Sequence, residues 1–144
     1  MNGRNVWARL LSMALVAGLM FGPIALGAWK AGASKVNITP KYAVRLSGYG
    51  SRTTEHEGVK VEIWAKAMAI GWDDEPPAVV ITVDNCGLPA SLRAQVLAEL
   101  RGQNVMDDRL AVCSSHTHCA PMVNGMLRNM FGIDLPADQQ ERVD

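Results

Sequence analysis

Residues 78–83 read Ala-Val-Val-Ile-Thr-Val, and the predicted fold is built around this run. A short continuous stretch of apolar and β-branched residues is typical of a buried central strand. A helical pattern follows it: Pro89 is a favoured residue for the first helical position, and Leu92, Val96 and Leu100 recur every four residues as one apolar stripe. The sequence therefore predicts a strand that leads directly into an amphipathic helix.

The helix ends and a second strand begins within a few residues. Arg101 in the last turn and Gly102 just beyond it fit a helix end, and residues 110–113, Leu-Ala-Val-Cys, form another buried strand run. Strand, helix and strand in this order predict a right-handed crossover between parallel neighbours.

Two earlier segments predict further strands. Residues 31–39 alternate apolar and polar side chains towards their end, which indicates a half-buried strand that Pro40 stops. Residues 61–72 place large side chains on one face and small ones on the other, as in a strand covered on both faces. The short polar turn 73–77 makes this strand an antiparallel neighbour of 78–83. The fold class is α/β with a mixed β-sheet, incomplete as given, since one helix leaves a sheet face uncovered.

Composition limits the function. The 144 residues suggest one modest domain, and 14 basic residues balance 14 acidic ones. We therefore expect no nucleic-acid partner, because the chain offers no broad basic face. Cys86, Cys113 and Cys119 are an odd number of thiols without a disulfide-like spacing, so we interpret them as small packing residues.

Residues 1–28 have the features of an export signal. Arg4 and Arg9 form a positive start, and residues 10–26 are apolar but broken by Pro23. Small residues where a signal peptidase could cut are Ala25, Gly27 and Ala28. An uncleaved membrane anchor is the alternative, although such anchors need about 20 consecutive apolar residues. We predict a secreted or periplasmic protein whose mature part is residues 29–144.

The predicted chemistry lies beyond the carboxyl ends of the two crossover strands, where ligands bind in open α/β sheets. Asp84 follows the first strand, and His116 and His118 follow the second. Two histidines two residues apart point the same way in extended backbone and suit zinc. Hydrogen-bonded histidines at a strand end are the alternative, and Asp84 is equally suited to a cap before the helix.

The sequence gives weaker evidence for a functional role of the other polar residues. Cys113, His116, His118 and Cys119 fall on one short extended segment, and four ligands from it could hardly form a tetrahedron. His56 lies in a polar loop and is interpreted as solvated. Arg52, in the glycine-rich stretch 47–52, is either an anion contact or solvated.

At this point the sequence resembles the neutral, non-lysosomal ceramidases and their bacterial relatives. The resemblance rests on five segments in the family's order: 31–40, 47–52, 63–67, 83–88 and 114–121. It extends over 29–144, which we interpret as the truncated amino-terminal part of a ceramidase-like catalytic domain. The closing residues 136–144 look like the first turns of a helix without a terminal cap.

The resemblance implies a zinc-dependent amidohydrolase that splits ceramide into a fatty acid and a sphingoid base. It makes His116 a zinc ligand and His118 a catalytic residue beside the metal that contacts the substrate. The ion would polarise the carbonyl and activate the attacking water. The family's other zinc ligands, a histidine, a glutamate and a tyrosine, lie farther downstream than this chain reaches, so the isolated chain is expected to be inactive.

Two departures affect the substrate. Cys119 and Met122 stand where the family usually has serine and glycine. The expected partner is ceramide or a related N-acyl lipid, with peripheral membrane contact and no identified protein partner. One alternative is a hydrolase of another lipid ester or amide, and a second is a non-catalytic exported remnant or partner-binding fragment.

Overall fold

The computed structural model describes residues 27–123, 125–126 and 135–141. Its elements are the strands β1 (Trp29–Asn37), β2 (Trp64–Trp72), β3 (Ala78–Val83) and β4 (Leu110–Ser114), and the helices α2 (Ala90–Leu100) and α4 (Ala137–Gln140). Two short 3₁₀ turns, Arg101–Gln103 and Asp107–Arg109, connect α2 to β4. The predicted export signal lies outside the described residues apart from its last two positions.

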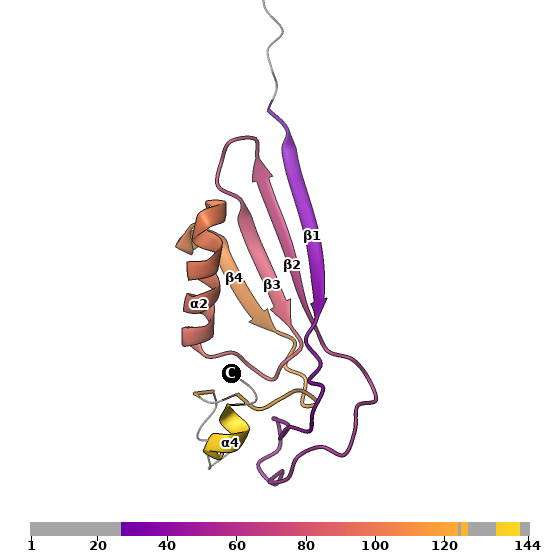
Figure 1. Cartoon of the computed structure of the whole chain (residues 1–144). Helices are drawn as coiled ribbons and strands as arrows, with labels where there is room; N and C mark the ends of the chain where they lie inside the picture. The colour runs from indigo at the N-terminus through magenta and orange to yellow at the C-terminus, as the bar shows by residue number, and fades with distance from the viewer. Residues whose placement is uncertain (1–26, 124, 127–134, 142–144) are drawn as a thin grey trace, which may run out of the picture.

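The strands form one mixed sheet in the order β1-β2-β3-β4 (Figure 1). β1 and β2 are antiparallel, as are β2 and β3, whereas β3 and β4 are parallel. This arrangement confirms the predicted α/β class, the antiparallel hairpin and the parallel pair. The right-handedness of the connection through α2 stays a prediction.

Helix α2 packs on one face of the sheet and forms the main apolar core. Val79, Val105 and Leu110 are buried there. Residues that pack against them from the helix and the strands are Ala69, Ile81, Val96, Leu97, Leu100 and Val112. The small side chains predicted for one face of β2 let the helix approach closely, and each buried valine or leucine stabilises the fold by about 1.5–3 kcal/mol.

The opposite face of the sheet corrects a prediction. Met68, Ile70 and Trp72 of β2 and Val80 of β3 are exposed, and every residue of β1 is exposed. Three predictions are therefore wrong for the described part of the chain. Strand β2 is not covered on both faces, β3 and β4 are not fully buried, and β1 is exposed and not half-buried. The physical reason is that α2 covers one face, and no described element packs on the other.

The ends of α2 also differ from the prediction. Pro89 is the N-cap and not the first helical residue, with φ −70° and ψ 151° in the extended region. At the other end the chain continues past Gly102 in a 3₁₀ turn and stops at Asn104, which has φ 60°. Asparagine tolerates this left-handed conformation, so it replaces glycine as the terminating residue.

The long connections gather at one end of the sheet. The loop between β1 and β2, the residues after β4 and the short helix α4 all lie below the carboxyl ends of β1, β3 and β4 (Figure 1). Helix α4 confirms that the chain turns helical after Pro136. Among the described residues, no helix has the length and apolar character needed to cross a membrane.

Candidate metal centre

The parallel pairing of β3 and β4 brings two distant segments together. Val83 and Ser114 are partners at the end of the ladder, and the N–H of Ser115 donates to the carbonyl of Val83 at 3.0 Å. The residues that follow each strand therefore leave the sheet side by side. This is the edge where the sequence predicts a site.

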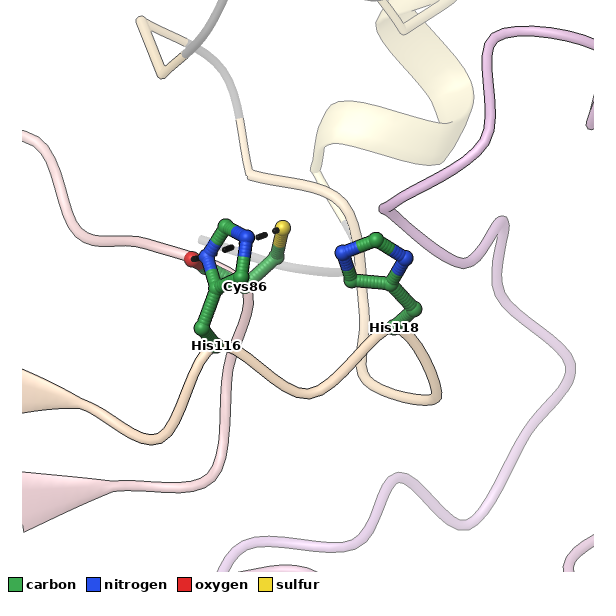
Figure 2. A group of neighbouring side chains, drawn as sticks. All are labelled: Cys86, His116 and His118. Carbon is green, nitrogen blue, oxygen red and sulfur yellow. Dashed lines mark hydrogen bonds between the residues drawn. The ribbon is translucent and has the colours of Figure 1, made fainter.

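Three potential metal ligands meet there. One ligand atom each from Cys86, His116 and His118 lies within 4.8 Å of the others. The ring centroids of the two histidines are 5.1 Å apart, with an angle of 71° between the planes. Figure 2 shows a nitrogen of each imidazole and the Cys86 sulfur facing a common space. The predicted His116 and His118 thus come together, with a cysteine that the prediction did not include.

The orientation of His116 is fixed by the neighbouring loop. Its Nδ1 lies 2.7 Å from the carbonyl oxygen of Cys86. A carbonyl can only accept, so Nδ1 carries the proton, and Nε2 keeps a free lone pair. Metal-binding histidines commonly donate their second ring N–H to a carbonyl in this way. The backbone φ of His116 is 58°, a region that few non-glycine residues adopt and that is enriched at functional sites.

Cys86 is anchored more firmly than the histidines. Its backbone N–H donates to the Asn85 side-chain oxygen at 2.6 Å, and the residue is only 1% exposed. It packs in a second apolar cluster with Met122, Met126 and Leu135. His116 is exposed and His118 is half-buried. Cys86 is thus the most buried member of the group.

The glycine-rich stretch 47–52 positions His118. Arg52 is half-buried and donates to the backbone carbonyls of Ser47, at 3.0 Å, and of His118. The ring of Tyr49 meets the His118 imidazole edge-on, with centroids 4.9 Å apart, and the Arg52 guanidinium lies 4.7 Å from the Tyr49 centroid. Arg52 was interpreted as an anion contact or as solvated. The structure instead shows that it links this loop to the histidine segment by hydrogen bonds.

Gly48 allows that close approach. A Cβ at this position would lie 2.3 Å from His118 Cγ, and the backbone φ is +103°. Only glycine fits both the space and this conformation without strain. The Cβ, Cγ and Nδ1 atoms of His118 face Gly48, so its Nε2 points towards the other two ligands (Figure 2).

Asp84 does not join this group, which corrects a further expectation. Its Oδ2 accepts a hydrogen bond from the backbone N–H of Trp64 at 3.0 Å, and its own N–H donates to the Trp64 carbonyl at 2.9 Å. The carboxylate therefore closes the end of the β2–β3 ladder. It neither faces the histidines nor caps the helix, for which no side-chain cap is present.

His56 also differs from its interpretation as a solvated residue. It is half-buried, and its backbone N–H donates to the Val44 carbonyl at 3.0 Å. The ring Nδ1 is buried and has no hydrogen-bond partner among the described residues. It lines a mainly apolar cavity of about 760 Å³. Cys119, which directly follows His118, lines the same cavity.

The ligand set suits a metal such as zinc. Imidazole nitrogens and a thiolate are the ligands zinc prefers, and a catalytic zinc has three protein ligands with one position open. Cys113 and Cys119 are exposed and do not belong to the group, which agrees with the rejection of a site built from one short segment. The three cysteines are free thiols. The Cys86/His116/His118 group could therefore hold a metal ion.

Fold and site together define an α/β domain with a candidate metal centre at the carboxyl edge of its sheet. Residues 29–133 match the N-terminal domain of the neutral/alkaline non-lysosomal ceramidases, and the chain belongs to this family. It is similar to the neutral ceramidase from Pseudomonas aeruginosa, with 25% identity and a TM-score of 0.59. The similarity covers 67% of this chain and 16% of the Pseudomonas chain. No curated protein sequence matches the chain.

Sequence reasoning found His116 and His118 but missed Cys86. The available signal was its position, since Cys86 follows β3 just as the histidines follow β4. A thiol beyond the carboxyl end of one parallel strand is a natural neighbour of side chains beyond the next.

Proposed function

We propose that this chain supplies part of the active site of a zinc-dependent amide hydrolase that acts on ceramide or a related N-acyl lipid. The observation that carries the proposal is the meeting of His116 and His118 with Cys86 at the carboxyl edge of the sheet in a ceramidase-family domain. In this proposal His116 is a zinc ligand and His118 is the catalytic residue that contacts the substrate.

The protein residues have distinct tasks. His116 would bind zinc through Nε2, because its Nδ1 proton is engaged by the Cys86 carbonyl. Zinc, when bound, supplies a Lewis acid that polarises the amide carbonyl and activates water. His118 is half-buried and held by Tyr49 and Arg52, so its ring can hold the amide group in a defined orientation. Such positioning accounts for a large part of the rate in many enzymes.

The neighbouring cavity favours a lipid substrate. Apolar side chains supply most of its wall, among them Val44, Leu46, Val59, Val61 and Ile63. A volume of about 760 Å³ lies within the range of roughly 300–1,000 Å³ typical of small-molecule pockets. Cys119, the residue after His118, lines the cavity, so in this proposal an alkyl chain occupies the cavity and the polar end of the lipid lies at His118. This supports an acyl or sphingoid chain as part of the substrate.

Residues 1–28 support export as a further part of the proposal, because a ceramidase acting on membrane lipids from outside the cytoplasm needs such a signal. Sequencing the amino terminus of the protein purified from its native host tests it. A mature terminus at or near Trp29 agrees with cleavage, and retention of Arg4 and Arg9 contradicts it.

A chimaera tests the substrate assignment. Residues 29–133 would replace the matching segment of the Pseudomonas ceramidase. The similarity covers 16% of that chain. We expect zinc-dependent release of fatty acid from ceramide, lost with His116→Ala and strongly reduced with His118→Ala. Hydrolysis of lipid esters in preference to amides would support the alternative substrate. A folded, zinc-loaded chimaera without either activity would contradict the proposal.

A further inference from the structure

We propose that His56 recognises a hydroxyl group on the hydrocarbon chain that the apolar cavity binds, and so selects hydroxylated lipids. The inference deepens the proposed function and depends on its assignment of the cavity to a lipid chain. His56 lines this cavity of about 760 Å³. Its ring Nδ1 is buried and has no hydrogen-bond partner among the described residues. A polar atom in this state, in the wall of an apolar binding site, points to a ligand that supplies the partner.

The position of the His56 ring allows such a contact. A buried donor or acceptor without a partner destabilises the folded state, and a ligand hydroxyl that pairs with it removes this penalty on binding. The backbone of His56 is held in place, because its N–H donates to the Val44 carbonyl at 3.0 Å. The ring can still turn about its last torsion, which is soft in histidine. The imidazole can therefore bring Nδ1 to a group in the cavity while the loop keeps its position.

The charged residues of the cavity decide which polar group fits. Glu55 and Glu57 line it together with Lys60, so carboxylates outnumber ammonium groups there. A carboxylate on the ligand would meet like charge and lose its hydration, which disfavours an anion. A hydroxyl is neutral and can both donate and accept, so it pairs with Nδ1 in either tautomer of the imidazole. A hydroxylated aliphatic chain therefore satisfies the apolar wall and His56 together.

The pairing of the loops places His56 away from the histidine segment. Isolated β-bridges pair segment 44–46 with Pro121 on one side and with Glu55 on the other. Paired strands lie about 4.8 Å apart, so two such spacings separate the backbone of His56 from the segment after His118 by about 10 Å. The polar end of the lipid lies at His118 in the proposed function. The hydroxyl that His56 meets is therefore several carbons along the chain, and not beside the amide group.

Protection of Cys119 from alkylation measures lipid binding without relying on activity. Cys119 lines the cavity and is exposed, so a bound chain should slow its reaction with a maleimide. The variant Cys113→Ser leaves Cys119 as the one exposed thiol, because Cys86 is buried. The probes are two ceramides in detergent micelles that differ by one hydroxyl at the middle of the acyl chain.

We expect the hydroxylated ceramide to protect Cys119 at a concentration about 2–10-fold lower than the plain ceramide. His56→Phe keeps an aromatic ring and removes its hydrogen bond, so the two ceramides should then protect equally. His56→Asn places a polar atom near the position of Nδ1 and should keep the preference. Far-ultraviolet circular dichroism checks the fold of both variants.

The outcomes separate this inference from the proposed function. Equal protection by the two ceramides in the protein with His56, or a preference that persists in His56→Phe, would overturn the role of His56 and leave the cavity as a lipid site. Absence of protection by either ceramide would overturn both the inference and the assignment of the cavity to a lipid chain.

Discussion

A single methyl group added at Gly48 tests the close contact between the glycine-rich stretch 47–52 and His118. In Gly48→Ala the new Cβ would lie 2.3 Å from His118 Cγ and 2.5 Å from its Cβ. Carbon atoms at van der Waals contact are about 3.5 Å apart, so the imidazole must move by about 1.2 Å. The alanine must also adopt a φ near +103°, which costs on the order of 1–3 kcal/mol in stability.

Both effects can be measured on the same protein. Urea denaturation should show a loss of about 1–3 kcal/mol in the free energy of unfolding, and NMR should show a shifted His118 imidazole. A displacement of about 1 Å in a catalytic group can lower a rate by about 100-fold, so the ceramidase chimaera with Gly48→Ala should lose activity on that scale.

Gly58→Ala is the matched control, because nothing lies within 4 Å of a Cβ built at Gly58 in the same loop. We expect it to leave the stability and the His118 signals close to those of the wild type. If Gly48→Ala and Gly58→Ala behave alike, with an unmoved His118, the close approach of the glycine-rich loop to the histidine segment is wrong.

Two further substitutions separate structural roles from metal binding. Asp84→Ala leaves the strand-end N–H of Trp64 without its acceptor, so it should lower the free energy of unfolding by about 1–3 kcal/mol. The zinc affinity should not change. Loss of zinc binding at wild-type stability would instead make Asp84 a ligand. Arg52→Ala removes the hydrogen bond to the His118 carbonyl and should cost up to about 3 kcal/mol. Arg52→Ala should also broaden the His118 NMR signals. The control Arg101→Ala, at an exposed site, should change neither the stability nor these signals. Equal effects of the two substitutions would show that Arg52 does not position His118.

Sequence reasoning predicted the sheet because local patterns determine most of it. The β-branched run of β3, the following apolar stripe and the second apolar run fix a strand, a crossover helix and a parallel strand. The polar turn after Trp72 fixes the hairpin. These features rest on neighbours in the chain, and so a single sequence contains them.

Exposure of the second sheet face could not be predicted in the same way. Strands β2 and β3 have apolar residues on both faces, Met68 and Val80 among them, as a doubly covered strand does. Only the arrangement of the other elements decides whether both faces are covered. The pattern records that a residue is apolar. It does not record whether a partner layer is part of the described structure.

The site was partly predictable for a related reason. The rule that ligands bind beyond parallel strand ends located His116 and His118, but it could not distinguish Asp84 from Cys86. Their side chains diverge within the turn after β3: Asp84 bonds to the Trp64 backbone, and Cys86 faces the imidazoles. The approach of Gly48 to His118 joins residues far apart in the chain, and no local pattern indicates it.

Zinc binding by the full chain shows whether His116 is a metal ligand. Zinc affinity measured by competition with a chromophoric chelator, together with the zinc content after dialysis, would compare the wild type with His116→Ala and His56→Ala. His56 lines the cavity but lies outside the metal group, so its substitution is the matched control. We predict equal zinc affinity for the wild type and for His56→Ala, and an affinity lower by more than about 10-fold for His116→Ala. Equal zinc affinity in all three proteins would show that His116 is not a zinc ligand and would contradict the proposed metal site.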